Sequence, residues 1–158
     1  MANSIRSPKD IVAALGSFPD ELGRAIAGAD DLDALLRPAS DGGWGVVEIL
    51  PHLRDWEEIY FERFTRLLEE DQPYLPGFDD ALWSIERDYR GQDPHETFDS
   101  FRELRERTVE LLRSLPESAW TRGGEHGYFG QITVQWLGDH IVDHDQEHLQ
   151  QTRDALAA

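Results

Sequence analysis

Two histidines near the C-terminus have the spacing of a metal-binding pair. His144 and His148 are four residues apart in a segment whose apolar residues recur at helical spacing. Four residues make about one turn of an α-helix, so both imidazole rings can reach one point beside the same face. His52 occupies an inward position in a second periodic segment, between Ile49 and Trp56. Because imidazoles are common ligands of zinc and related ions, the sequence predicts one divalent ion bound by these three histidines.

Spacing alone leaves open which pair in the last helix binds the ion. His140 precedes His144 by one turn, so His140 and His144 can form the pair instead. His140 and His148 lie about 12 Å apart along a helix axis, too far to share one ion. If His144 and His148 are ligands, His140 or Asp143 is expected to orient a ligand ring; the alternative is that both are exposed polar residues. His95 is predicted to be a surface residue.

Three neutral imidazoles leave positions open on the ion, which is typical of catalytic sites. Water bound there is acidified toward a pKa of about 7, and an incoming thiol is deprotonated. The chain has no cysteine, so a thiol would have to come from a small molecule. Glu48, one turn before His52, is a candidate general base or second-sphere group; the alternative is an ordinary helix-capping carboxylate.

Two long helices are predicted in the first half of the chain. Ser7 and Pro8 are typical of a helix cap followed by a first-turn proline, and Pro19 is expected to kink or divide that helix. The second long helix is predicted over residues 45–70. Pro51 lies inside it and is expected to bend the helix beside the first histidine.

Two further long helices are predicted in the second half of the chain. Residues 71–93 form a linker with a short amphipathic helix around Trp83. The third long helix is predicted to start at Pro94 and to end before Pro116. The glycine-rich segment 121–131 then leads into the histidine helix and is predicted to be either a plain loop or a lid over the site. No alternating strand pattern stands out.

These segments predict an all-α fold, an up-and-down four-helix bundle with an extra short helix between the second and third long helices. With 39% apolar and 10% aromatic residues, positions 1–158 suit a single domain with its own core. Bundles of this kind build metal sites from inward side chains on facing helices.

Composition excludes several classes of partner. The net charge of −17 repels nucleic acid and anionic lipid, so neither a nucleic-acid nor a membrane partner is expected. No apolar run approaches the roughly 20 residues of a membrane span, and the first ten residues lack a signal-peptide core. The absence of cysteine is compatible with a reducing compartment, so a cytoplasmic location is expected.

Two other metal motifs compete with this interpretation. The string from His144 to His148 matches the His-x-x-Glu-His motif of inverted zinc proteases, with Glu147 as the base. On a helix, however, Glu147 points about 100° away from His148, and five matching residues are a weak signal. Ferritin-like di-iron sites need paired glutamates and two Glu-x-x-His pairs, and the sequence offers no such set.

The histidines and their neighbours also resemble a known family. The pattern Trp44-x3-Glu48-x3-His52-Leu53-x-Asp55, followed by Asp143-His144-x3-His148-x2-Gln151, is similar to the DinB-like (DinB/YfiT) superfamily. The resemblance covers most of the chain. It implies a four-helix bundle, often dimeric, whose three histidines bind zinc, nickel or a similar ion. Carried onto matching positions, the ligands are His52, His144 and His148.

The sequence departs from the family pattern at three places. Gly45 stands where a serine or threonine usually starts the helix, Pro51 precedes the histidine, and Leu149-Gln150 replaces a more basic, glycine-containing stretch. These departures keep all three histidine ligands.

The resemblance implies a metal-dependent enzyme that activates water or a low-molecular-weight thiol. The reaction would be hydrolysis of a small electrophile or thiol transfer to it, and some relatives use mycothiol or bacillithiol. The alternative is a noncatalytic bundle that binds a metal or small ligand in a stress response.

Overall fold

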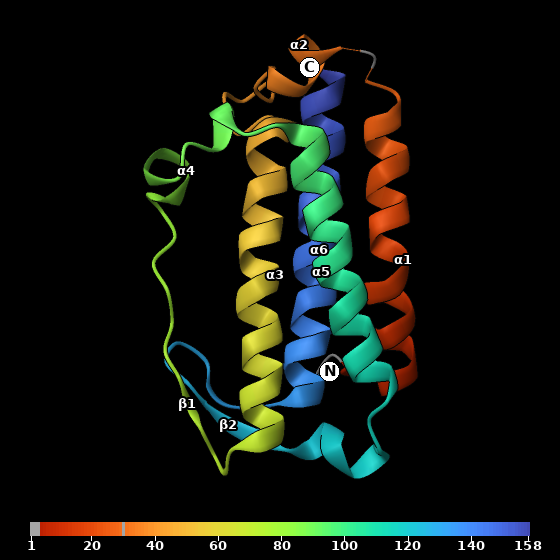
Figure 1. The fold of residues 1–158 in the computed structure, drawn as a ribbon, viewed down its shortest axis with the longest axis vertical. Helices are drawn as coiled ribbons and strands as arrows, with labels where there is room; N and C mark the ends of the chain where they lie inside the picture. Colours follow the sequence, from red (N-terminus) through yellow and green to blue (C-terminus); the bar gives the residue numbers. More distant parts are fainter. Residues whose placement is uncertain (1–3, 30) are drawn as a thin grey trace.

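Four long helices form the body of the protein in the computed structural model, which describes residues 4–29 and 31–158 (Figure 1). They are α1 (Pro8–Ala27), α3 (Val46–Glu69), α5 (Pro94–Arg113) and α6 (Val134–Ala157). A short helix, α2 (Leu32–Leu36), precedes α3. Between α3 and α5 lie α4 (Trp83–Glu86) and a 3-10 turn (Tyr89–Gly91). The predicted four-helix bundle and its extra short helix are therefore confirmed.

The direction of the helices differs from the expected up-and-down order. In Figure 1, α3 and α5 both run from the upper end to the lower end, whereas α1 and α6 run the opposite way. The two consecutive helices are parallel because the chain between them returns along the outside of α3. We call residues 76–91 of this return the α3–α5 connection.

Prolines inside the helices do not interrupt them. Of the two outcomes expected at Pro19, a kink or a division, the division is wrong, because α1 continues through this residue. A proline cannot donate a hydrogen bond to the carbonyl of Leu15, four residues earlier. Arg105 of α5 donates to that oxygen instead, from Nη1 at 3.2 Å. α3 likewise continues through Pro51.

The start of α3 explains why glycine replaces the usual serine or threonine. The Gly45 N–H donates to Glu48 Oε1 at 3.3 Å, and the Glu48 N–H donates to the Gly45 carbonyl at 3.1 Å. A β-carbon on Gly45 would lie 2.5 Å from the carbonyl oxygen of Arg37. Only glycine allows the chain before α3 to approach this closely.

A small sheet, which was not predicted from the sequence, lies at the lower end of the bundle (Figure 1). Strand β1 (Tyr74–Leu75) pairs in parallel with β2 (Gly123–His126), and β2 pairs antiparallel with β3 (Gly130–Thr133). The expected loop over 121–131 is therefore largely a β-hairpin. A β-carbon on Gly124 would lie 2.6 Å from the Pro73 carbonyl oxygen, so glycines that hide the strand pattern allow the strands to pack closely.

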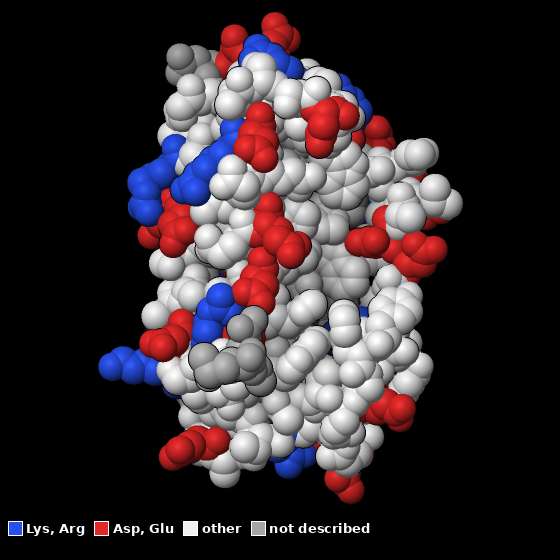
Figure 2. All heavy atoms as spheres, turned by 180° about the vertical axis from the view of Figure 1, so that it is seen from behind, with Lys and Arg blue, Asp and Glu red and all other residues white. Residues whose placement is uncertain are grey.

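Charged side chains of both signs lie over the back of the molecule (Figure 2). Uncharged atoms predominate at the lower right, where the hairpin and the start of the α3–α5 connection lie. These segments and β1 contain the exposed rings of Tyr74, Phe78, Tyr128 and Phe129. Among the residues that the structure describes, every helix is too short or too polar to cross a lipid bilayer.

Candidate metal centre

Three histidine side chains from α3 and α6 converge inside the bundle. One nitrogen atom from each of His52, His144 and His148 lies within 4.8 Å of the other two. The Nε2 atoms of His144 and His148 are 3.1 Å apart. The centroid of the His52 ring lies 4.6 Å from that of His148 and 5.5 Å from that of His144. The structure thus brings together the three histidines selected from the sequence.

Aromatic rings and an amide hold these imidazoles in place. The rings of Trp44 and His52 pack edge to face with centroids 5.1 Å apart, and Tyr60 packs against His144 in the same way at 5.9 Å. Gln151 Oε1 lies 2.7 Å from Nδ1 of His148. Because a carbonyl oxygen accepts, Nδ1 carries the hydrogen and the lone pair of Nε2 faces the other histidines.

Burial keeps the three imidazoles neutral. It lowers the pKa of His52 to about 4, and the nearby His148 adds to this shift. Burial also lowers the pKa of His144 well below its usual value, and His148 and His52 lower it further. The pKa of His148 is lowered by burial against the opposing effect of Gln151. At neutral pH each ring therefore has a free lone pair, the form that binds metal ions.

A buried ion network joins all four long helices next to the histidines. Arg105 of α5 donates to both oxygens of Asp145 on α6, at 2.7 and 2.9 Å, and to Glu57 Oε1 on α3 at 3.0 Å. Its contact with Leu15 adds α1. The three charged side chains are at most 2% exposed. Since Asp145 follows His144 directly, this network fixes the rotation of α6 that turns the histidine pair toward α3.

The carboxylate of Glu48 binds residues other than the three histidines. Its Oε1 accepts the Gly45 N–H and a hydrogen bond from Arg90 Nη1 at 3.0 Å. Its carboxylate therefore caps α3 and binds the end of the α3–α5 connection, in agreement with the capping alternative.

The two other expected second-sphere residues also have separate contacts. Asp143 is exposed and pairs with Arg6 at 2.9 Å. His140 stacks on Trp136, with centroids 4.8 Å apart, and packs against Phe129 at 5.2 Å. The structure places His140 one turn away from the converging rings, in an aromatic cluster under the hairpin.

The geometry of the three rings fits a transition-metal ion. At zinc–nitrogen distances of about 2.0–2.1 Å, two ligand nitrogens of a tetrahedral ion lie about 3.3 Å apart. The 3.1 Å between the Nε2 atoms of His144 and His148 is close to this separation. Three neutral nitrogen donors suit a transition-metal ion better than magnesium or calcium, which prefer oxygen ligands.

Comparison with known proteins gives the family. The sequence profile of the DinB superfamily matches residues 6–152. The chain belongs to the DinB superfamily. The family expected from the histidine pattern is therefore confirmed.

Relatives of this DinB-superfamily protein are named as proposed metal-dependent hydrolases. A protein from Geobacillus thermodenitrificans is 32% identical over 114 residues, and YfiT from Bacillus subtilis is 31% identical over 115 residues. These alignments cover 72% and 73% of this chain but only 64% of each relative's own length. The relatives and the three-histidine cluster together fit a metal-dependent protein.

The solved structure of Bacillus subtilis YfiT shares the fold. It is described as a probable metal-dependent hydrolase with an unusual four-helix bundle topology, and it superposes with a TM-score of 0.87 at 26% sequence identity. The match covers 98% of this chain and 90% of the YfiT chain.

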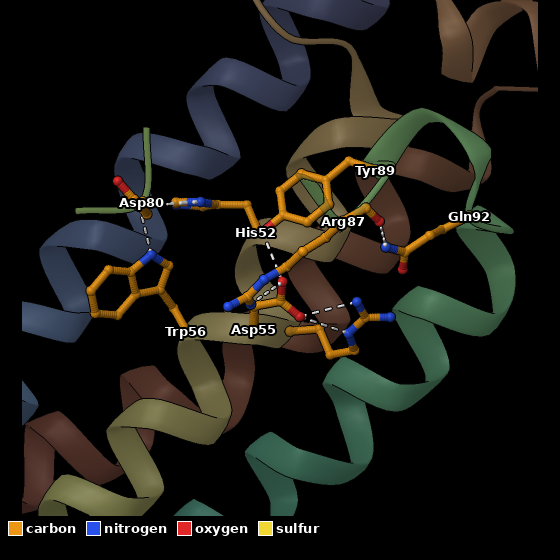
Figure 3. Close-up of polar contacts among 8 residues, drawn as sticks. His52, Asp55, Trp56, Asp80, Arg87, Tyr89 and Gln92 are labelled. Atoms are coloured by element: carbon orange, nitrogen blue, oxygen red, sulfur yellow. Dashed lines mark hydrogen bonds and ion pairs between the residues drawn. The ribbon is translucent and has the colours of Figure 1, made fainter. Parts of the chain in front are cut away.

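Asp80, a carboxylate beside the cluster, was not predicted from the sequence. Its Oδ2 accepts a hydrogen bond from Trp56 Nε1 at 2.8 Å and lies 3.8 Å from His52 Nδ1 (Figure 3). Asp80 belongs to the α3–α5 connection, which has no helical periodicity before α4. Helical periodicity in the sequence therefore could not identify Asp80 as a residue of the site.

Asp55 anchors the same connection on α3. Its Oδ2 accepts from Arg87 Nη1 at 3.0 Å and from the Tyr89 hydroxyl at 2.8 Å (Figure 3). Farther down α3, Arg63 Nη2 donates to the Pro76 carbonyl at 2.8 Å. The connection is thus fixed on both sides of Asp80.

The lowered histidine pKa values predict an acid-sensitive metal-free protein. The unfolded chain takes up a proton on His52 near pH 6.5, whereas the folded chain does so only near pH 4. Stability therefore falls as the pH drops from about 6.5 to about 4, by about 3 kcal/mol for this group. Urea unfolding of the metal-free protein across this range should show a smaller loss for His52→Asn than for the exposed control His95→Asn. Equal losses in the two variants would contradict this assignment.

Proposed function

We propose that this protein is a metal-dependent enzyme that acts on a small electrophilic molecule, by hydrolysis or by thiol transfer. Its ligands would be His52, His144 and His148, and its ion zinc or nickel. The observation that carries the proposal is the convergence of three neutral imidazoles from two helices, one of them buried and two half-buried. The names of the relatives support the hydrolytic branch.

The residues around the ligands would hold the reactant and limit access of water. When bound, the ion would act as a Lewis acid that favours the deprotonated form of water or a thiol. Trp44 packs on the imidazole of His52 and Tyr60 on that of His144, and the α3–α5 connection places Asp80 beside His52. A site of this kind suits a small reactant better than a polymer.

We assign the remaining expected residues to structure. Glu48 would act as the cap of α3 rather than as a general base, because its carboxylate already binds Gly45 and Arg90. His140 and Asp143 would contribute to packing and surface pairing. We also propose that the chain forms one domain and a homodimer, which limited proteolysis and light scattering can test.

Metal-dependent turnover is the test of this function. Metal-free protein, alone and reloaded with zinc or nickel, is assayed against a panel of small esters and against electrophiles with a low-molecular-weight thiol. We expect turnover only in the loaded protein, and its loss in His148→Ala at unchanged circular dichroism. His95→Ala, altered at an exposed histidine, should keep full activity.

Two outcomes would oppose the proposal. Equal turnover of His148→Ala and wild type would remove the metal centre from the reaction. Binding of metal with a raised melting temperature, but without turnover on any substrate, would favour the noncatalytic metal-binding bundle.

A further inference from the structure

Asp80 lies beside the histidine cluster, whereas its neighbour Asp79 does not contact it. The side chain of Asp79 is exposed, and its Oδ1 accepts the local Ala81 N–H at 3.1 Å. The side chain of Asp80 is 35% exposed and turns inward, where Oδ2 binds Trp56 and faces Nδ1 of His52 (Figure 3). Of these two adjacent aspartates, Asp80 faces the histidines and Asp79 faces solvent.

In His148, an oxygen acceptor beside Nδ1 determines which ring nitrogen carries the hydrogen. Its Nδ1 has an acceptor, Gln151 Oε1, so the ring presents Nε2 toward the other two histidines. Asp80 Oδ2 occupies the equivalent place beside Nδ1 of His52, although at 3.8 Å it is too distant for a hydrogen bond. The carboxylate charge favours a proton on the nearer nitrogen.

We propose that Asp80 is a positioning residue of the metal centre: it holds the proton of His52 on Nδ1, so that Nε2 is the nitrogen that binds the ion. The role in metal binding rests on the proposed function. Coordination makes the remaining N–H of an imidazole more acidic, and a carboxylate is the acceptor that responds most strongly. Because Arg63 and Asp55 fix the connection on either side, Asp80 also joins this segment to the ion.

The first test compares zinc affinity in two matched variants. Asp80→Asn keeps an acceptor for Trp56 but removes the charge, and Asp79→Asn makes the same change one residue away. Loss of an outer-sphere partner typically weakens metal binding about 10- to 100-fold. We expect this loss for Asp80→Asn in a chelator competition assay, and wild-type affinity for Asp79→Asn. Equal zinc affinities in the two variants would overturn the proposal.

The second test needs no metal. Nitrogen-15 NMR of the metal-free protein at neutral pH reports which ring nitrogen of His52 carries the proton. We expect the Nδ1–H tautomer in wild type and in Asp79→Asn, with a smaller Nδ1–H population in Asp80→Asn. An Nε2–H tautomer in wild type would overturn the role of Asp80. Failure of wild type to bind zinc would instead reject the metal centre, while the tautomer would still decide the role of Asp80.

Discussion

Replacing Arg105 by methionine is expected to lower the free energy of unfolding by about 3–5 kcal/mol. The substitution leaves Glu57 and Asp145 buried without their shared cation, while their side chains are at most 2% exposed. It also removes the donor that occupies the Leu15 carbonyl opposite Pro19. Urea denaturation monitored by circular dichroism measures the loss.

Arg102→Met is the matched control for this prediction. Arg102 lies on the same helix, but its partner Asp20 is 64% exposed, and exposed pairs contribute only about 1 kcal/mol or less. Replacing Arg105, Glu57 and Asp145 together by apolar residues of similar volume is expected to recover most of the stability. Equal losses for Arg105→Met and Arg102→Met would show that the buried network does not hold the bundle together.

Removing a histidine ligand is expected to have the second large effect. His148→Ala should weaken zinc binding by more than the roughly 10- to 100-fold expected for an outer-sphere residue, because one of three coordinate bonds is lost. Zinc at about 1,000 times its dissociation constant should stabilise the wild-type fold by about 4 kcal/mol, and a chelator should remove this gain. Competition titration and thermal unfolding measure the two effects.

His140→Ala decides between the two ligand pairs that spacing allows. Its ring stacks on Trp136, one turn from His144, so the variant is expected to keep zinc affinity. If His140→Ala loses as much affinity as His148→Ala, the ligand pair in α6 is wrong.

The sequence predicted those parts of the fold that periodicity and capping residues specify. Pro8 and Pro94 marked helix starts correctly, because a first-turn proline loses no helical hydrogen bond. The β-hairpin was missed because its first strand begins with Gly123 and Gly124, which have no side-chain alternation. The parallel course of α3 and α5 depends on the path of an irregular connection, which local patterns do not determine.

The candidate site was predicted where its residues lie on helices. His52, His144 and His148 could be chosen because inward positions recur at known spacing. Arg105 and Asp145 were missed, since a charged residue in a helix is usually exposed and only the tertiary fold pairs these two. Asp80 was missed because it reaches the cluster from a segment without periodicity.

The position of a bound ion tests the central claim most directly. Crystals of zinc-loaded protein, measured at wavelengths on both sides of the zinc absorption edge, should give one strong anomalous peak. We expect this peak about 2.0–2.1 Å from one nitrogen of each of His52, His144 and His148. A peak at His126 and His140 instead, or at surface carboxylates only, would contradict the three-histidine centre.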